Sequence, residues 1–114
     1  MRQLFIATTA ALFLAGCTET PDLACDIVDK SGPTSSHQCN ELHSLDATQQ
    51  KDAEDACPRL GGVIVDSCST TGEIGVCTLT SDGLVQNIHF YPGGLSAAEH
   101  EATCKQFAGT WTAD

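Results

Sequence analysis

The residues with the widest chemical repertoire in this sequence are its seven cysteines and four histidines. Cysteine forms disulfides, acts as a nucleophile or binds metal, and histidine acts as an acid, a base or a metal ligand. The sequence contains no Cys-x-x-Cys or His-Glu-x-x-His spacing, no Gly-x-Ser-x-Gly and no glycine-rich phosphate loop. We therefore expect no catalytic residue, no bound metal and no cofactor.

A zinc or copper site is the alternative interpretation of the histidines. His37, Cys39 and His43 lie close together, with His89 and His100 further along the chain. Histidines exposed in loops explain the same residues without a metal, and an even number of exported cysteines is better used in disulfides.

Cys17 is set apart from the other cysteines by the residues before it. Arg2 is followed by an uncharged run over residues 4–14, which is too short to span a bilayer but typical of a secretory signal. Leu14-Ala15-Gly16-Cys17 resembles the lipobox of bacterial lipoproteins. That resemblance implies cleavage before Cys17 and fatty acyl chains on its sulfur and new N-terminus. Thr18, where Asp is linked to inner-membrane retention, implies the outer membrane. An ordinary cleaved signal is the alternative.

The mature chain would be a small acidic domain. Cleavage removes Arg2 and no acidic residue, which leaves 98 residues with four basic and fifteen acidic side chains, a formal charge of −11. Nucleic acid is excluded as a partner because its binding rests on lysine and arginine. Leu, Ile, Val and Phe make up less than a fifth of these residues, so the core needs covalent support.

Six cysteines remain for that support once Cys17 is lipidated: Cys25, Cys39, Cys57, Cys68, Cys77 and Cys104. An even number in an exported chain predicts three disulfides. Fifteen pairings are possible. We consider Cys25 and Cys39 plausible partners, because they enclose a segment that reads as a loop. Cys77 is expected to pair with Cys57 or Cys104, and Cys68 with whichever of these is left.

Two helices carry cysteines. Asp46 and Gln49 form a capping-box pattern before a helix predicted at 47–60, whose apolar stripe ends at Leu60 and which Gly61 terminates. A second box at Ser96 opens a helix predicted at 97–107. Its apolar side comprises Cys104, Phe107 and Ala108, and Gly109 is expected to end it. A buried strand at 63–65 and a final strand at 110–112 follow the two helices.

Between the helices, Asp82-Gly83 predicts a tight hairpin that joins strands at 76–80 and 84–91. One face would carry Cys77, Leu79, Ile88 and Phe90 and meet the helices. The other face would carry His89 and Tyr91. These two residues, together with Trp111, form a possible binding surface for an envelope protein or a glycan. The alternative is that they pack beneath the N-terminal loop.

Residues 52–64 and 99–111 form an internal repeat when aligned on Cys57 and Cys104. Each copy has an acidic helix, a cysteine, a small-residue–Gly pair and a strand. The expected fold class is α+β: a small disulfide-stapled domain, with two short helices against a small antiparallel sheet with a central hairpin. We expect a signal peptide at 1–16, a lipidated cysteine and tether at 17–24 and the cysteine-rich domain at 25–114.

The arrangement Cys-x₃-Gly-Gly, Gly75-Val76-Cys77, His89-Phe90-Tyr91 and a closing Cys-x₃-Ala-Gly-Thr-Trp resembles that of small cysteine-rich envelope lipoproteins of Gram-negative bacteria. This resemblance implies a fold and no activity. We expect a membrane-anchored envelope lipoprotein with a non-enzymatic, structural or interaction role. The alternatives are a protein-binding or inhibitor module that uses the loop 31–37 and, less favoured, a metal-binding protein.

Overall fold

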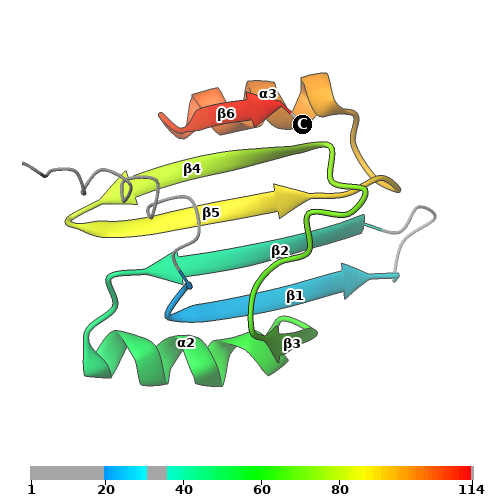
Figure 1. Ribbon diagram of the computed structural model, residues 1–114. Helices are drawn as coiled ribbons and strands as arrows, with labels where there is room; N and C mark the ends of the chain where they lie inside the picture. Colours follow the sequence, from blue (N-terminus) through cyan, green and yellow to red (C-terminus); the bar gives the residue numbers. More distant parts are fainter. Residues whose placement is uncertain (1–19, 31–35, 114) are drawn as a thin grey trace, which may run out of the picture.

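The structure is a computed structural model that describes residues 20–30 and 36–113. The expected signal peptide and Cys17 lie outside this range. The elements are β1 (Leu23–Asp29), β2 (Ser36–His43), α2 (Ala47–Arg59), β3 (Gly62–Val65), β4 (Gly75–Ser81), β5 (Leu84–Phe90), α3 (Ala97–Gln106) and β6 (Thr110–Ala113). The strands form one six-stranded antiparallel sheet, and the helices lie toward its two edges (Figure 1). The α+β class is therefore confirmed, with the sheet dominant. Among the described residues, no helix is long and apolar enough to cross a membrane.

The sheet is a duplication. Its strand order β3-β1-β2-β5-β4-β6 reads the same in reverse when β1, β2 and β3 are exchanged for β4, β5 and β6. A pseudo-twofold axis therefore relates two strand–strand–helix–strand units across the β2·β5 pair. The repeat predicted from the sequence covers the helix and the last strand of each unit. The structure shows that the two strands before each helix belong to the repeat as well.

One row of cross-strand partners shows how the helices attach. Ile64, Cys25, Asn40, Ile88, Cys77 and Trp111 face one another across all six strands. Directly paired residues point to the same face of a sheet, so Cys25 and Cys77 emerge on one side. Cys25 bonds to Cys57 of α2, and Cys77 bonds to Cys104 of α3. Both helices are thus stapled to the same face, as expected.

The predicted set of six disulfide cysteines is confirmed, but only part of the predicted pairing is correct. Cys77–Cys104 is one of the two pairs allowed for Cys77. Cys25 and Cys39 are not partners, and Cys68 bonds to Cys39 instead of to a helix cysteine. The reason is that Cys25 and Cys39 lie on adjacent strands with opposite facing, where Asp26 is the residue opposite Cys39.

The segment from Cys25 to Cys39, expected to be a loop, contains most of β1 and half of β2. These strands pair along seven residues, from Leu23–Leu42 to Asp29–Ser36. β1 also begins at Leu23, two residues inside the expected tether. The loop composition belongs to residues 30–35, of which 31–35 lie outside the described range.

The predicted capping boxes and the hairpin turn are confirmed, as is Gly61 as the left-handed residue after α2, but Ala108 and not Gly109 takes the left-handed conformation after α3. The Asp46 and Ser96 side chains accept from the backbone N–H groups of Gln49 and Glu99, and both capping boxes are complete. In the hairpin, Thr80 faces Val85 and Cys77 faces Ile88, as predicted. Asp82 and Gly83 have φ values of 51° and 84°, which is the geometry of a tight two-residue hairpin turn.

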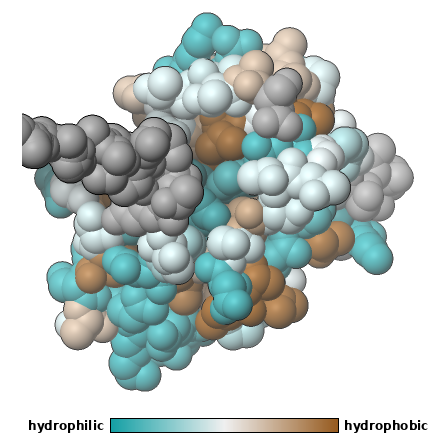
Figure 2. Space-filling model, viewed as in Figure 1, coloured by the Kyte–Doolittle hydropathy of each residue, from teal (hydrophilic) through white to brown (hydrophobic). Residues whose placement is uncertain are grey.

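The predicted apolar stripes are wrong at their C-terminal ends. Leu60 and Phe107 occupy equivalent C-cap positions and are exposed. Val63 and Ile64 in β3, expected to be buried, are also exposed because β3 is an edge strand. Figure 2 shows hydrophobic surface in the lower part of the molecule, beside the hydrophilic surface of α2.

Candidate functional site

The segment 66–74, called here the strap, joins the two repeat units and crosses the sheet face opposite the helices (Figure 1). The Cys39–Cys68 disulfide fixes it to β2, and the Tyr91 hydroxyl donates to the Ser69 carbonyl at 2.5 Å. Ala24, Cys39, Cys68 and Tyr91 form a small buried cluster beneath it, with Val65 packed alongside. The strap thus buries part of one face of the sheet, although the strands beneath it are rich in polar residues.

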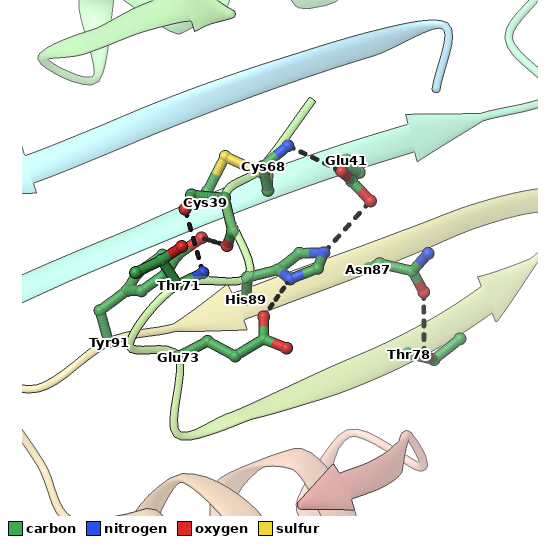
Figure 3. Close-up of polar contacts among 10 residues, drawn as sticks. Cys39, Glu41, Cys68, Thr71, Glu73, Thr78, Asn87, His89 and Tyr91 are labelled. Atoms are coloured by element: carbon green, nitrogen blue, oxygen red, sulfur yellow. Dashed lines mark hydrogen bonds and ion pairs between the residues drawn. A yellow bond between two sulfur atoms is a disulfide. The ribbon is translucent and has the colours of Figure 1, made fainter. Parts of the chain in front are cut away.

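Below the strap, a histidine is held between two carboxylates (Figure 3). His89 Nδ1 lies 2.6 Å from Glu73 Oε1, and His89 Nε2 lies 3.1 Å from Glu41 Oε1. The second oxygen of Glu41 accepts from the Cys68 backbone N–H at 2.8 Å. An imidazolium donates from both ring nitrogens, whereas a neutral ring donates from one. A protonated His89 therefore satisfies both carboxylates.

The three groups come from three different elements. His89 lies on β5, Glu41 lies on β2 and Glu73 lies in the strap. Glu41 and His89 are also equivalent under the pseudo-twofold axis, since each is one residue beyond the Asn40–Ile88 pair that the axis crosses. The axis brings these positions together, and the two different side chains come within hydrogen-bond distance there. These contacts hold the strap on β2 of the first unit and on β5 of the second unit.

A second pair lies at the margin of the strap. His37 Nε2 is 2.7 Å from Asp26 Oδ1, and the His37 ring stacks on Tyr91 with centroids 4.2 Å apart. Burial, followed by the nearby Glu73, Asp26 and Glu41 carboxylates, raises the pKa of Tyr91 to about 12. The pocket beside this pair has a volume of about 130 Å³. Pockets for organic ligands are usually about 300–1,000 Å³, so it fits little beyond water or a small ion.

The binding surface predicted from His89, Tyr91 and Trp111 is not an exposed surface. His89 and Tyr91 are 8% and 5% exposed, beneath the strap. Trp111 is half-buried in β6 on the opposite face, where its ring lies against the glycine at position 75. The alternative is correct in that His89 and Tyr91 are buried, but the segment that contacts them is the strap and not the N-terminal loop.

The other histidines do not converge on one point. His43 has a buried Nε2 with no hydrogen-bond partner in the described part of the chain. His100 stacks on Phe90 at 3.9 Å on the helix side, and its burial lowers its pKa. The grouping that comes closest to a metal site is Glu41, Cys68 and His89, whose ligand atoms lie within 4.8 Å of one another. The Cys68 sulfur is bonded to Cys39 and offers no thiolate, which leaves Glu41 and His89 as the two ligands of this group.

Sequence reasoning did not identify Asp26, Glu41 or Glu73 as parts of a site. They are isolated acidic residues in segments without a recognisable motif. Alternation along the predicted hairpin placed His89 on the non-helical face, but nothing in the sequence located its partners. No protein-family model, curated protein or solved structure matches this chain.

Proposed function

We propose that this protein is a cell-envelope lipoprotein, anchored through Cys17 and targeted to the outer membrane, whose domain has a non-enzymatic structural or interaction role. The observation that carries the proposal is the Leu14-Ala15-Gly16-Cys17 box at the end of an uncharged run. Two or three acyl chains on one cysteine give stable attachment, whereas a single chain is marginal. The six remaining cysteines, paired in three disulfides, suit an oxidising compartment.

The non-enzymatic part of the proposal rests on how the polar groups are used. His89, Glu41 and Glu73 bond to one another beneath the strap. A general base must instead be within reach of a substrate proton. The pocket beside the Asp26–His37 pair is too small for an organic substrate. These contacts account for His37, His89 and the carboxylates that they contact as a structural network.

The test is acyl-chain labelling in a Gram-negative host that expresses the full chain. Cells are fed an alkyne fatty acid, and the protein is recovered for detection of the label and for flotation with membranes. We expect the native chain to be labelled and to float. Cys17→Ala should lose both properties, while the neighbouring Thr18→Ala control should keep the label. Equal labelling of the native and Cys17→Ala chains would refute the anchor.

A further inference from the structure

Four of the six large apolar side chains that are exposed in the described part of the chain lie around the edge strand β3, while Leu95 and Phe107 lie elsewhere. Leu60, Val63 and Ile64 are 62%, 65% and 48% exposed, and Val28 at the adjoining end of β1 is also exposed. We call these four residues the β3-edge patch. β3 pairs with β1 alone among the described strands and carries no ionisable residue. Edge strands are normally protected by charge, proline or a covering segment, so a clustered apolar edge indicates that something covers it.

Two of the four basic residues of the mature chain border the β3-edge patch, where Asp29 and Asp66 are its acidic neighbours. Arg59 precedes Leu60, and Lys30 follows β1 two residues after Val28. Within the described ranges neither forms an ion pair. The other two basic residues pair along their own helices, Lys51 with Asp55 and Lys105 with Glu101. Apolar side chains flanked by unpaired cations are typical of surfaces that rest on phospholipid.

The chain enters the domain beside the same strand. Thr20 and Pro21 line a groove of about 480 Å³ together with Ile64 and Val65 of β3. Asp22 fixes this entry, since its backbone N–H donates to the Leu42 carbonyl at 2.9 Å and its carboxylate accepts from the Leu45 N–H at 2.9 Å. The Gln50 side chain donates to the Asp22 carbonyl at 3.0 Å. The direction from which an N-terminal anchor pulls is therefore set by the fold.

We propose that the β3-edge patch lies on the phospholipid surface to which Cys17 is anchored, with Leu60, Val63 and Ile64 in the headgroup region and Arg59 and Lys30 toward the phosphates. This inference rests on the proposed function. Two residues separate Cys17 from Thr20, and the three steps between them span at most about 11 Å. The anchor thus holds the entry groove, and β3 beside it, close to the membrane. The edge strand β6 of the other unit lies at the far side of the sheet.

A second copy of the chain is the competing occupant of this edge. Pairing two β3 edges would bring together two domains of formal charge −11, which repel one another. A zwitterionic or mixed phospholipid surface carries phosphates that match Arg59 and Lys30. The lipid surface therefore fits both the apolar residues of the patch and the two cations beside it.

The pseudo-twofold axis provides a matched control for the test. Val63 of β3 and Thr110 of β6 are equivalent, because each is six residues after the helix cysteine of its unit. Both are exposed on edge strands. The chain has one tryptophan, so Trp111→Phe supplies a silent background. Val63→Trp and Thr110→Trp are then made separately in that background, in the full-length lipidated protein.

Each variant is reconstituted into vesicles of phosphatidylethanolamine and phosphatidylcholine, which carry no net charge, with or without brominated acyl chains. Bromines quench tryptophan that enters the bilayer surface. We expect the emission of the Val63→Trp variant to fall about twofold or more and that of the Thr110→Trp variant to stay unchanged. Equal quenching of both, or of neither, in vesicle-bound protein would overturn the proposal. Protein that fails to bind vesicles at all would instead contradict the anchor.

Hydrogen exchange of the unmodified lipidated protein gives a second readout that does not depend on the tryptophan variants. Backbone amides of Gly62–Val65 should exchange more slowly in vesicles than in detergent, while those of Thr110–Ala113 should not change. Slowing that depends on protein concentration and persists in detergent would assign the edge to a second copy and overturn the lipid assignment.

Discussion

At the scale of single residues, the structure depends on a few polar contacts that stand in for a large apolar core. The buried apolar cluster beneath the strap has four members, two of which are the bonded cysteines Cys39 and Cys68. The strap is held there by Glu41, Glu73 and Tyr91 as well. Buried polar groups stabilise a fold only while every partner is present. This network should therefore be sensitive to single changes.

The first prediction concerns His89. Replacing it in His89→Ala leaves Glu41 and Glu73 without the ring that contacts both, and each buried polar group left unsatisfied costs about 1–3 kcal/mol. We expect a correspondingly lower free energy of unfolding in urea. Thr78→Val is the control on the same sheet face, since it removes a 2.8 Å bond to Asn87 worth about 1 kcal/mol. Equal losses in the two variants would mean that the His89 network does not hold the strap.

The second prediction concerns Tyr91, the one tyrosine of the sequence. Its pKa is raised from 10.0 to about 12, so the folded state favours the neutral phenol. The stability gained from this group is complete below pH 10 and is lost as the pH rises toward 12. Absorbance at the phenolate band should titrate near 12 in the native protein and near 10 in denaturant. A native midpoint near 10 would show that the strap leaves Tyr91 open to water.

At the scale of elements, the sequence predicted both helices, the central hairpin and the last strand to within one or two residues. Their signals are local: capping boxes at Asp46 and Ser96 and the Asp82-Gly83 turn. β1 and β2 were missed because β2 is polar on both faces, with Gln38 and Asn40 on one side and Glu41 on the other. Its burial comes from the strap and its hydrogen bonds. The sequence of β2 therefore lacks the alternation of apolar and polar residues from which a half-buried strand is predicted.

The site could be predicted only in part for a related reason. The even set of cysteines predicted the staples, and the hairpin register placed Cys77 toward a helix. The partners of His89 lie 48 and 16 residues away in sequence and meet through the long-range pairing of β2 with β5. That pairing follows from the duplication of the whole unit. In the sequence, the repeat is visible only in the second half of each unit, which comprises the helix, the glycine and the last strand.

The glycines of the repeat lead to a third prediction. A Cβ on Gly109 would lie 2.8 Å from the Sγ atoms of both Cys77 and Cys104, and one on Gly62 would collide with the Cys25–Cys57 bond in the same way. Each helix–strand turn therefore needs glycine to pass its own disulfide. Gly62→Ala should lower the free energy of unfolding by about 1–3 kcal/mol or leave thiols unpaired.

Val63→Ala is the matched control, because the adjacent side chain is exposed and its loss should matter little. Urea denaturation midpoints and a count of free thiols distinguish the two variants. If Gly62→Ala kept the native midpoint with all three disulfides formed, the close approach would not be required.

At the scale of the whole molecule, two equivalent units are joined by a strap, and each unit is closed by a disulfide between its first strand and its helix. The third disulfide belongs to the strap. Each disulfide stabilises a domain by about 2–4 kcal/mol, which matters for a chain with so few large apolar residues. The chain enters this small body at Thr20 and Pro21, beside β3.

The most direct test of the account is the mass of the N-terminal peptide of the protein purified from the membranes of a Gram-negative host. We predict a peptide that begins at Cys17 and carries the added mass of two or three fatty acyl chains. Its Cys25 should be linked to the peptide that contains Cys57. A peptide that begins at Met1, or one that begins elsewhere with an unmodified Cys17, would contradict the lipoprotein assignment.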